Sequence, residues 1–322
     1  MHGIFIGAAS QAQLLKSNAE YSKLFREQYS LTTAENACKW GPIHPSRDMY
    51  TWGRCDAVFE AAEAAGQAVR GHNLCWHTEN PSWLTNGNLS AATLSEVLRE
   101  HVTAVVQHYG TRAYCWDVVN EAIADGTNAS QFLKPSAPWY PAVGDYIDVA
   151  FKAARAADPT RQVKLFYNEY SAEGMTPKSD KVYQLVKGMI DRKIPIDGVG
   201  LQMHINLDSY QESPAFLKDV AQNMARLHEL SLEVHITEMD IKCVPKGSTK
   251  TCTSELLLRQ AKLYANLLRV CLDAPNCKAF ETWDFIDKYS WIGESSAPLP
   301  WASDYTAKPA VSAMVNEMLK MK

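Results

Sequence analysis

The stretch Tyr114-Cys115-Trp116-Asp117-Val118-Val119-Asn120-Glu121 shows a pattern that recurs along the chain. It is rich in aromatic and β-branched residues, which favours a buried strand, and it ends abruptly in an amide and a carboxylate. A second stretch, Val234-His235-Ile236-Thr237-Glu238, has the same form. Buried strands that deliver polar side chains at their carboxyl ends are typical of parallel α/β barrels, where the functional groups lie at that end.

Six more short apolar runs bring the expected strands to eight. The segments between them have helical periodicity, as in Leu94-Val97-Leu98-Val102-Val105-Val106. Eight alternating strands and helices predict a (β/α)8 TIM barrel, an α/β fold, as a single domain over residues 1–322. A doubly wound open sheet would need a Gly-rich phosphate turn after an early strand, and none is present. The expected strands are Ile4–Ile6, Leu31–Thr33, Ala68–Arg70, Tyr114–Val119, Val163–Phe166, Val199–Leu201, Val234–Thr237 and Ala279–Thr282.

Composition and net charge disfavour several classes of binding partner. The 322 residues are 46% hydrophobic and 21% charged, which is ample for a large core. The formal net charge is −4 and no basic block occurs, so nucleic acid and anionic membrane are poor candidates. No apolar run approaches the ~20 residues that a membrane span needs. We expect a monomer.

The eight cysteines point to an oxidising compartment. Cys271 and Cys277 flank a five-residue turn, and Cys243 and Cys252 flank a polar loop, so each pair suits a disulfide. A zinc site is the alternative, but no Cys-x₂-Cys pattern supports it. We therefore expect an extracellular, secreted protein, with sequons at Asn88 and Asn128. The remaining cysteines allow three pairings or none: Cys38, Cys55, Cys75 and Cys115.

Glu121 and Glu238 supply the chemistry that this arrangement suits. A retaining glycosidase needs one carboxyl group to protonate the leaving oxygen and a second to attack the sugar carbon, about 5–5.5 Å away. The two glutamates lie far apart in the sequence, but a barrel gathers all strand ends at one face. The sequence therefore predicts a sugar-cleaving enzyme. Because carboxylates and water suffice for this reaction, we expect no cofactor and no metal.

Six blocks, in order and across nearly the whole chain, resemble the signature segments of glycoside hydrolase family 10, whose members are mostly endo-β-1,4-xylanases. Six ordered blocks are far more specific than one Asn-Glu pair. The resemblance implies one catalytic barrel with no separate carbohydrate-binding module. The blocks are Thr33–Trp40, Gly71–His77, Trp116–Glu121, Gly200–His204, Ile236–Asp240 and Trp283–Trp291.

The same resemblance implies roles for individual residues. Glu121 would be the general acid/base and Glu238 the nucleophile, with His204 donating to the nucleophile and Asn120 contacting the sugar 2-hydroxyl. The structural alternatives are a solvated carboxylate for each glutamate and a turn or cap role for Asn120. The other implied substrate-binding residues are Glu35, Asn36, Lys39, His72, Trp76, Glu79, Tyr170, Gln202, Trp283 and Trp291.

Several positions depart from the family pattern. Glu79 stands where the family usually has Gln, and Asp284 where it has Gly, so both would add carboxylates near the cleft. Glu169 stands where Asp is usual, and Cys38 and Cys75 replace apolar residues. The alternative for Glu79 is a loop carboxylate that points to water.

The sequence is compatible with three functions. The first is a retaining endo-glycosidase that cleaves β-1,4-linked xylose chains. The second keeps the mechanism and releases an oligosaccharide from a plant glycoside of the saponin type. The third is a non-catalytic barrel that binds polysaccharide, which is disfavoured because both glutamates and their supporting His and Asn are present. In each case the partner is a polysaccharide or an oligosaccharide.

Overall fold

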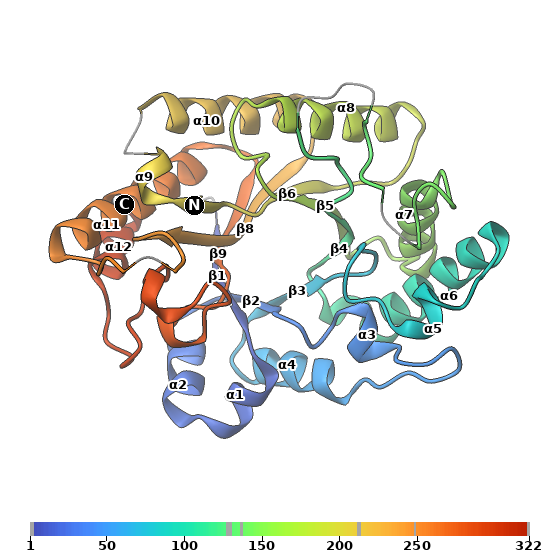
Figure 1. Ribbon diagram of the computed structural model, residues 1–322, viewed down its shortest axis with the longest axis horizontal. Helices are drawn as coiled ribbons and strands as arrows, with labels where there is room; N and C mark the ends of the chain where they lie inside the picture. Colours follow the sequence, from blue (N-terminus) through green and yellow to red (C-terminus); the bar gives the residue numbers. More distant parts are fainter. Residues whose placement is uncertain (1–2, 127–130, 136–137, 211–213, 248, 321–322) are drawn as a thin grey trace.

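A computed structural model describes residues 3–126, 131–135, 138–210, 214–247 and 249–320; Asn128 lies outside these ranges. Its centre is a closed barrel of parallel strands surrounded by helices, as the view down the barrel shows (Figure 1). Pairing of β6 with β8 and of β9 with β1 closes the ring. The barrel strands are β1 (Phe5–Ser10), β2 (Leu31–Ala34), β3 (Ala68–His72), β4 (Cys115–Asn120), β5 (Lys164–Glu169), β6 (Gly198–Leu201), β8 (Glu233–Lys242) and β9 (Cys277–Thr282).

The predicted (β/α)8 barrel is confirmed, and each expected strand overlaps an observed one. The main difference is β7 (His204–Asn206), a short extra strand that pairs with the far end of β8. In that pairing His204 lies opposite Asp240, and β8 extends beyond the expected Val234–Thr237. The extension matters because it holds His204 and Glu238 on neighbouring strands.

The helices form the outer layer, and local signals place several of their ends. Ser90 caps α6 by accepting a hydrogen bond from the backbone of Thr93, and Thr176 caps α8 in a capping box with Ser179. The α-helices are α1 (Ala12–Ser17), α2 (Ala19–Gln28), α3 (Trp40–Ile43), α4 (Gly53–Ala64), α5 (Ser82–Thr85), α6 (Ala91–Tyr109), α7 (Tyr146–Ala157), α8 (Pro177–Asp191), α9 (Leu207–Tyr210), α10 (Pro214–Glu229), α11 (Ser254–Asp273) and α12 (Pro309–Leu319). Short 3-10 turns are η1 (Gly110–Arg112), η2 (Asp287–Tyr289) and η3 (Glu294–Ser296).

The barrel interior contains a buried polar layer below the strand ends. Arg70 binds both carboxylate oxygens of Asp117, and its Nη1 lies 2.8 Å from Nδ1 of His235. Gly200 is required above this layer, because a Cβ atom there would lie 2.1 Å from Oδ1 of Asn168. The missing side chain lets Asn168 reach the centre of the barrel mouth.

Three disulfides tie surface segments together. The structure pairs Cys243 with Cys252 and Cys271 with Cys277, the two pairs that the spacing favours. Of the four cysteines left open, Cys38 and Cys55 form a third disulfide, which joins the loop after β2 to α4. The other two are free and buried: Cys75 and Cys115. In the described ranges, no helix has both the length and the hydropathy to cross a membrane.

Candidate active site

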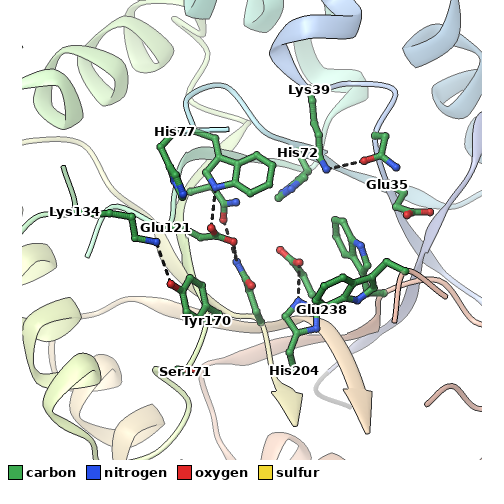
Figure 2. A pocket seen from close by; sticks show the side chains of 16 residues that line it. Glu35, Lys39, His72, His77, Glu121, Lys134, Tyr170, Ser171, His204 and Glu238 are labelled. Carbon is green, nitrogen blue, oxygen red and sulfur yellow. Dashed lines mark hydrogen bonds and ion pairs between the residues drawn. The ribbon is translucent and has the colours of Figure 1, made fainter. Parts of the chain in front are cut away.

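A cavity of about 610 Å³ opens at the carboxyl ends of the strands (Figure 2). All the predicted site residues except Glu79 line it, so the fold gathers side chains from almost the whole length of the sequence. The lining residues are Glu35, Asn36, Lys39, His72, Trp76, His77, Asn120, Glu121, Lys134, Tyr170, Ser171, Gln202, His204, Glu238, Trp283 and Trp291. In the described part of the chain, no group of three or more His, Cys, Asp or Glu side chains is arranged to hold a metal ion.

Glu121 and Glu238 enter the cavity from β4 and β8. Glu121 follows the last residue of β4 with a φ of 58°, a left-handed conformation that a non-glycine residue adopts only when its surroundings hold it there. Its backbone N–H donates to the carbonyl of Asn168 at 2.9 Å, which fixes this turn. Figure 2 shows both carboxylates directed into the cavity from opposite sides.

The surroundings of Glu238 favour its ionised form. Burial acts to raise its pKa, but a hydrogen bond from His204 and the charges of His72 and His204 outweigh burial and lower that pKa. Nε2 of His204 lies 3.2 Å from one carboxylate oxygen, and Nδ2 of Asn168 donates to the other at 2.7 Å. Asp240 binds Nδ1 of His204 at 2.7 Å.

His204 is therefore held as an imidazolium between two carboxylates. Burial lowers its pKa, but Asp240 and Glu238 more than compensate and raise that pKa to about 10. Both ring nitrogens then act as donors. This arrangement explains how a buried glutamate stays charged.

Glu121 is held by two neutral donors. Nε1 of Trp76 donates to one carboxylate oxygen at 2.9 Å, and Nε2 of Gln202 donates to the other at 3.0 Å. Gln202 also donates to Oδ1 of Asn120 at 3.2 Å, and the same oxygen accepts from Asn168 at 3.0 Å. Asn168 also donates to Glu238. The side-chain amides of Gln202, Asn120 and Asn168 therefore link Glu121 to Glu238 through consecutive hydrogen bonds.

Glu35, Asn36 and Lys39 form another part of the cavity wall, and Figure 2 shows Glu35 on the far side of Glu238 from Glu121. Nζ of Lys39 donates to Oδ1 of Asn36 at 2.7 Å and lies 5.0 Å from the ring centroid of Trp76. Burial raises the pKa of Glu35, and its Oε2 is buried with no hydrogen-bond partner in the described structure. The charged groups of this wall, those of Glu35 and Lys39, are therefore largely buried at the edge of the cavity.

Aromatic faces complete the cavity. Trp283 is mostly buried and meets the ring of His72 edge-on, with the centroids 5.1 Å apart. Trp291 is 51% exposed, and its indole N–H donates to Asp240 at 2.9 Å. A large aromatic side chain with its polar atom engaged and its ring exposed is suited to packing against the C–H face of a sugar.

Asp284 does not enter the cavity, in contrast to the expectation that it adds a carboxylate to the cleft. It is 1% exposed, with a φ of 63°. Its Oδ1 accepts from the backbone N–H groups of Phe285 and Ile286, and its Oδ2 accepts from Gln11 and Tyr21. Burial, aided by the charge of Glu35, raises its pKa to about 7. The backbone donors direct this side chain below the cavity floor.

Glu79 also lies outside the cavity lining. It is exposed and has a φ of 56°, and its carbonyl accepts a hydrogen bond from the N–H of Gly41 at 2.9 Å. The backbone of Glu79 thus supports α3, and its side chain reaches solvent. The charge of Glu79 still contributes to the site at longer range, where it offsets part of the lowering that burial imposes on the pKa of Lys39.

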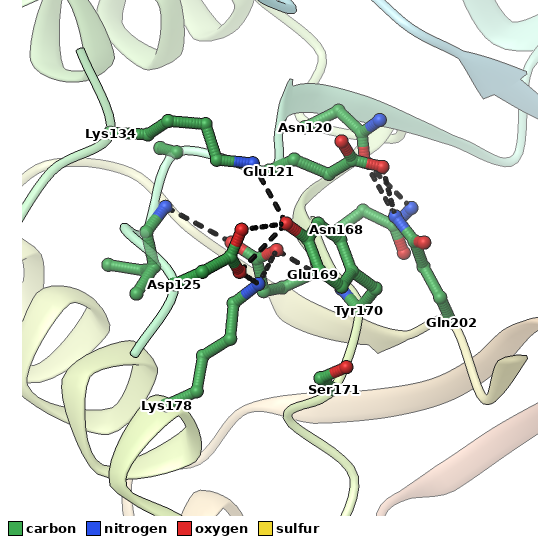
Figure 3. A network of polar contacts seen from close by, with 12 residues as sticks. Asn120, Glu121, Asp125, Lys134, Asn168, Glu169, Tyr170, Ser171, Lys178 and Gln202 are labelled. Atoms are coloured by element: carbon green, nitrogen blue, oxygen red, sulfur yellow. Dashed lines mark hydrogen bonds and ion pairs between the residues drawn. The ribbon is translucent and has the colours of Figure 1, made fainter. Parts of the chain in front are cut away.

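A second polar network lies beside Glu121 (Figure 3). The hydroxyl of Tyr170 accepts from Nζ of Lys134 at 3.0 Å and donates to the carboxylate of Asp125. Lys178 lies 2.8 Å from Asp125 and 3.1 Å from Glu169. Glu169 is fully buried, and burial raises its pKa to about 7. Glu169 therefore anchors Lys178, whose Nζ lies 3.2 Å from the ring centroid of Tyr170.

Three lining residues were missed by sequence reasoning: His77, Lys134 and Ser171. His77 lies at the end of the block Gly71–His77, and Ser171 follows Tyr170, so proximity to the motifs could have identified both. Lys134 comes from the long segment between β4 and α7, which carries no strand-end signal. Only the folded chain brings Lys134 to the cavity.

Comparisons with known proteins agree with this geometry. The family model described as "Glycosyl hydrolase family 10" matches residues 1–317. Endo-1,4-beta-xylanase B of Neocallimastix patriciarum is 36% identical over 311 residues, which cover 97% of this chain; the chain spans only 34% of that relative's length. Endo-1,4-beta-xylanase B of Thermotoga neapolitana is 34% identical over 94% of this chain and 85% of that protein. Xylanase 10B from Thermotoga petrophila RKU-1, solved in complex with xylobiose, superposes with a TM-score of 0.90 at 33% identity over 99% of this chain and 95% of that one. The barrel, the cavity and these matches together show that the chain belongs to glycosyl hydrolase family 10.

Proposed function

We propose that this protein is a retaining endo-1,4-β-xylanase, which cleaves xylan-type β-1,4-xylosidic bonds by double displacement. The observation that carries the proposal is the contrast between the two glutamates across one cavity. Glu238 is kept ionised by the His204 imidazolium, whereas Glu121 accepts from two neutral donors among the described residues, Trp76 and Gln202. Two carboxyl groups in different environments are what an acid and a nucleophile require.

In the first step, Glu238 attacks the anomeric carbon of the sugar. The bond from that carbon to the glycosidic oxygen breaks, and Glu121 transfers its proton to the leaving oxygen. The product is a covalent ester between the sugar and Glu238. In the second step, water attacks the same carbon, Glu121 removes a proton from the water, and Glu238 departs as the carboxylate.

The neighbouring side chains support both steps. Oδ1 of Asn120 accepts from Asn168 and Gln202, which fixes the orientation of this amide, and its NH2 group would contact the sugar 2-hydroxyl. Lys39, Glu35 and Asn36 would bind hydroxyl groups of the sugar on the non-reducing side. Trp76, Trp283 and Trp291 would provide the apolar surfaces. Xylobiose in the related Thermotoga petrophila structure supports an oligosaccharide as the occupant of this cavity.

We further propose that the protein acts outside the cell. Disulfides persist in oxidising environments and are rare in reducing ones. Three disulfides in one chain support a secreted enzyme that meets its polymer in the medium. Trapping free thiols in protein recovered from its native source would test this, because an intracellular protein would keep all eight cysteines reduced.

The stereochemistry of the product tests the mechanism. Xylohexaose is incubated with the protein, and the new reducing end is followed by proton NMR at early times. We expect the β-anomer to form first and the α-anomer to appear only through mutarotation. Glu238→Gln should be inactive, while Glu27→Gln, a matched change on the exposed face of α2, should behave as the wild type. Initial release of the α-anomer would contradict retention, and an absence of cleavage would contradict the proposed substrate.

A further inference from the structure

Lys134 gives the cavity an ammonium group that forms no ion pair with a carboxylate in the described part of the chain. It lines the cavity, and its Nζ donates to the hydroxyl of Tyr170 at 3.0 Å. Within the residues that the structure describes, no carboxylate oxygen lies within 4.0 Å of this ammonium, whereas Lys178 has two such contacts. A cation at a cavity wall with only a neutral phenol as its direct partner is available to an anionic ligand.

The surrounding charges leave this cation largely uncompensated. Asp125 is engaged by Tyr170 and Lys178, and its side chain is 61% exposed, so solvent screens its charge. Burial raises the pKa of Glu169 to about 7, so this group is only partly ionised at neutral pH. Burial and the charge of Lys134 lower the pKa of His77, which keeps the neighbouring imidazole neutral. Lys134 therefore keeps an ammonium group without a direct carboxylate contact among the described residues, although the charges of Asp125 and Glu121 lie nearby.

The position of Lys134 indicates which part of a substrate it would meet. The proton donor must stand beside the leaving oxygen, so the groups beyond Glu121 face the leaving side of the sugar chain. Figure 2 shows Lys134, Tyr170 and His77 on the side of Glu121, and Lys39 and Glu35 on the opposite side. Lys134 therefore faces the leaving-group side of the cleft.

We propose that Lys134 is a specificity-determining residue that selects substrates with a carboxylate on the leaving-group side, that is, xylan bearing uronic acid branches. This inference rests on the proposed function. An ammonium has three N–H donors, and Tyr170 uses one of them. The remaining donors can bind a carboxylate through charge-assisted hydrogen bonds, which are stronger than neutral ones. A neutral branch at the same place could accept a hydrogen bond from the ammonium but would lack the attraction between opposite charges.

A purely structural role is the competing explanation, because Lys134 also holds the hydroxyl of Tyr170. The test must therefore separate charge recognition from support of the cavity wall. Uronic acid branches offer a matched pair of substrates for this purpose. Chemical reduction of their carboxyl groups to alcohols removes the charge and leaves the size of the branch almost unchanged.

The experiment compares kcat/KM on a uronic acid-branched xylan and on its carboxyl-reduced form. For the wild type we expect a preference of about tenfold for the acidic form at low salt, from one charge-assisted contact at a partly solvated site. Lys134→Gln should bring the ratio close to one, and Lys134→Arg should keep most of it. Tyr170→Phe should retain the preference, because it removes the phenol and leaves the ammonium. Lys187→Gln, an exposed change on α8, should leave the ratio at the wild-type value.

Two results of the comparison at low salt would overturn the proposal. One is a wild-type ratio near one, and the other is an equal loss on both substrates in Lys134→Gln. The preference of the wild type should also shrink in 0.5 M NaCl, and a ratio that is insensitive to salt would contradict a charge effect. Cleavage of unbranched xylohexaose by the wild type serves as the separate test of the proposed function, since it does not involve Lys134 recognition.

Discussion

Replacing Asp284 with Asn should stabilise the protein at pH 8, although it removes a carboxylate that accepts four hydrogen bonds. In the unfolded chain this carboxyl group ionises near its ordinary value of 3.8, whereas burial raises its pKa to about 7 in the folded protein. A raised carboxyl pKa means that ionisation opposes folding. The penalty is absent below pH 3.8, grows as the pH rises, and is complete above about pH 7.

The magnitude follows from the two pKa values. The difference between about 7 and 3.8, at about 1.36 kcal/mol per pH unit, corresponds to a penalty of up to about 4 kcal/mol. Asn reproduces the protonated aspartic acid, with one oxygen that accepts from Phe285 and Ile286 and one donor group that faces Gln11. The amide of Gln11 would rotate to present its oxygen and give up its 3.3 Å hydrogen bond to the carbonyl of Tyr289, and the hydroxyl of Tyr21 would accept instead of donating. We therefore expect a net gain of about 2 kcal/mol at pH 8, after the loss of charge-assisted bonds to the backbone.

Urea unfolding at several pH values measures this effect. The free energy of unfolding of Asp284→Asn, relative to the wild type, should rise steadily from pH 4.5 to pH 8. Asp191→Asn, an exposed change on α8, serves as the control and should show no such trend. A difference between Asp284→Asn and the wild type that is constant across this range would refute the argument, since a lost or gained contact alone does not depend on pH.

Three further predictions concern the catalytic pair and a disulfide. In His204→Gln, loss of the charge that lowers the pKa of Glu238 should move the acidic limb of the kcat/KM profile upward by about 1–2 pH units, because a hydrogen bond to a charged group contributes about 1.5–3 kcal/mol. His228→Gln on α10 is the control. An acidic limb at the wild-type pH in His204→Gln would rule out this role. In Glu121→Ala, aryl xylosides with good leaving groups should keep most of their first-step rate, because their departure needs no proton; equal losses on good and poor leaving groups would exclude Glu121 as the acid. Peptide mapping without reduction should find Cys271 bonded to Cys277, and the Cys271→Ser/Cys277→Ser variant should lose about 2–3 kcal/mol of stability; free thiols at these positions would disprove the pairing.

The strands could be predicted from the sequence because they are largely buried, several of them read as apolar runs, and helical periodicity separates them. The strand-end residues could be predicted for the same reason, since a polar residue directly after such a run must lie at the barrel mouth. β7 could not be predicted, because its three residues have no run of their own and depend on pairing with β8. The position of Lys134 depends on the path of a long segment that has no regular pattern.

The sequence placed Glu79 in the correct segment near the cavity but did not predict that its side chain points to solvent. The motif places this residue correctly beside α3, but its left-handed backbone turns the side chain to solvent, and nothing in the sequence marks that conformation. The direction of the Asp284 side chain could not be predicted from the sequence either. The hydrogen bonds that pull its carboxyl group below the floor come from the backbone of the two residues that follow it, and their geometry exists only in the fold.

The buried layer explains why the site needs so many charged groups beyond its two glutamates. Burial raises the pKa of both Asp117 and Glu281, but Arg70 and His72 bring that of Asp117 below its ordinary value, while that of Glu281 rises to about 8. At neutral pH the floor therefore holds one ion pair, Arg70 with Asp117, and a mostly neutral Glu281. Buried charges are tolerated only when paired, and His204 on β7 supplies the hydrogen bond that, with the charges of His72 and His204, keeps Glu238 ionised. The small strand that the sequence did not predict is thus what allows the nucleophile to be both buried and charged.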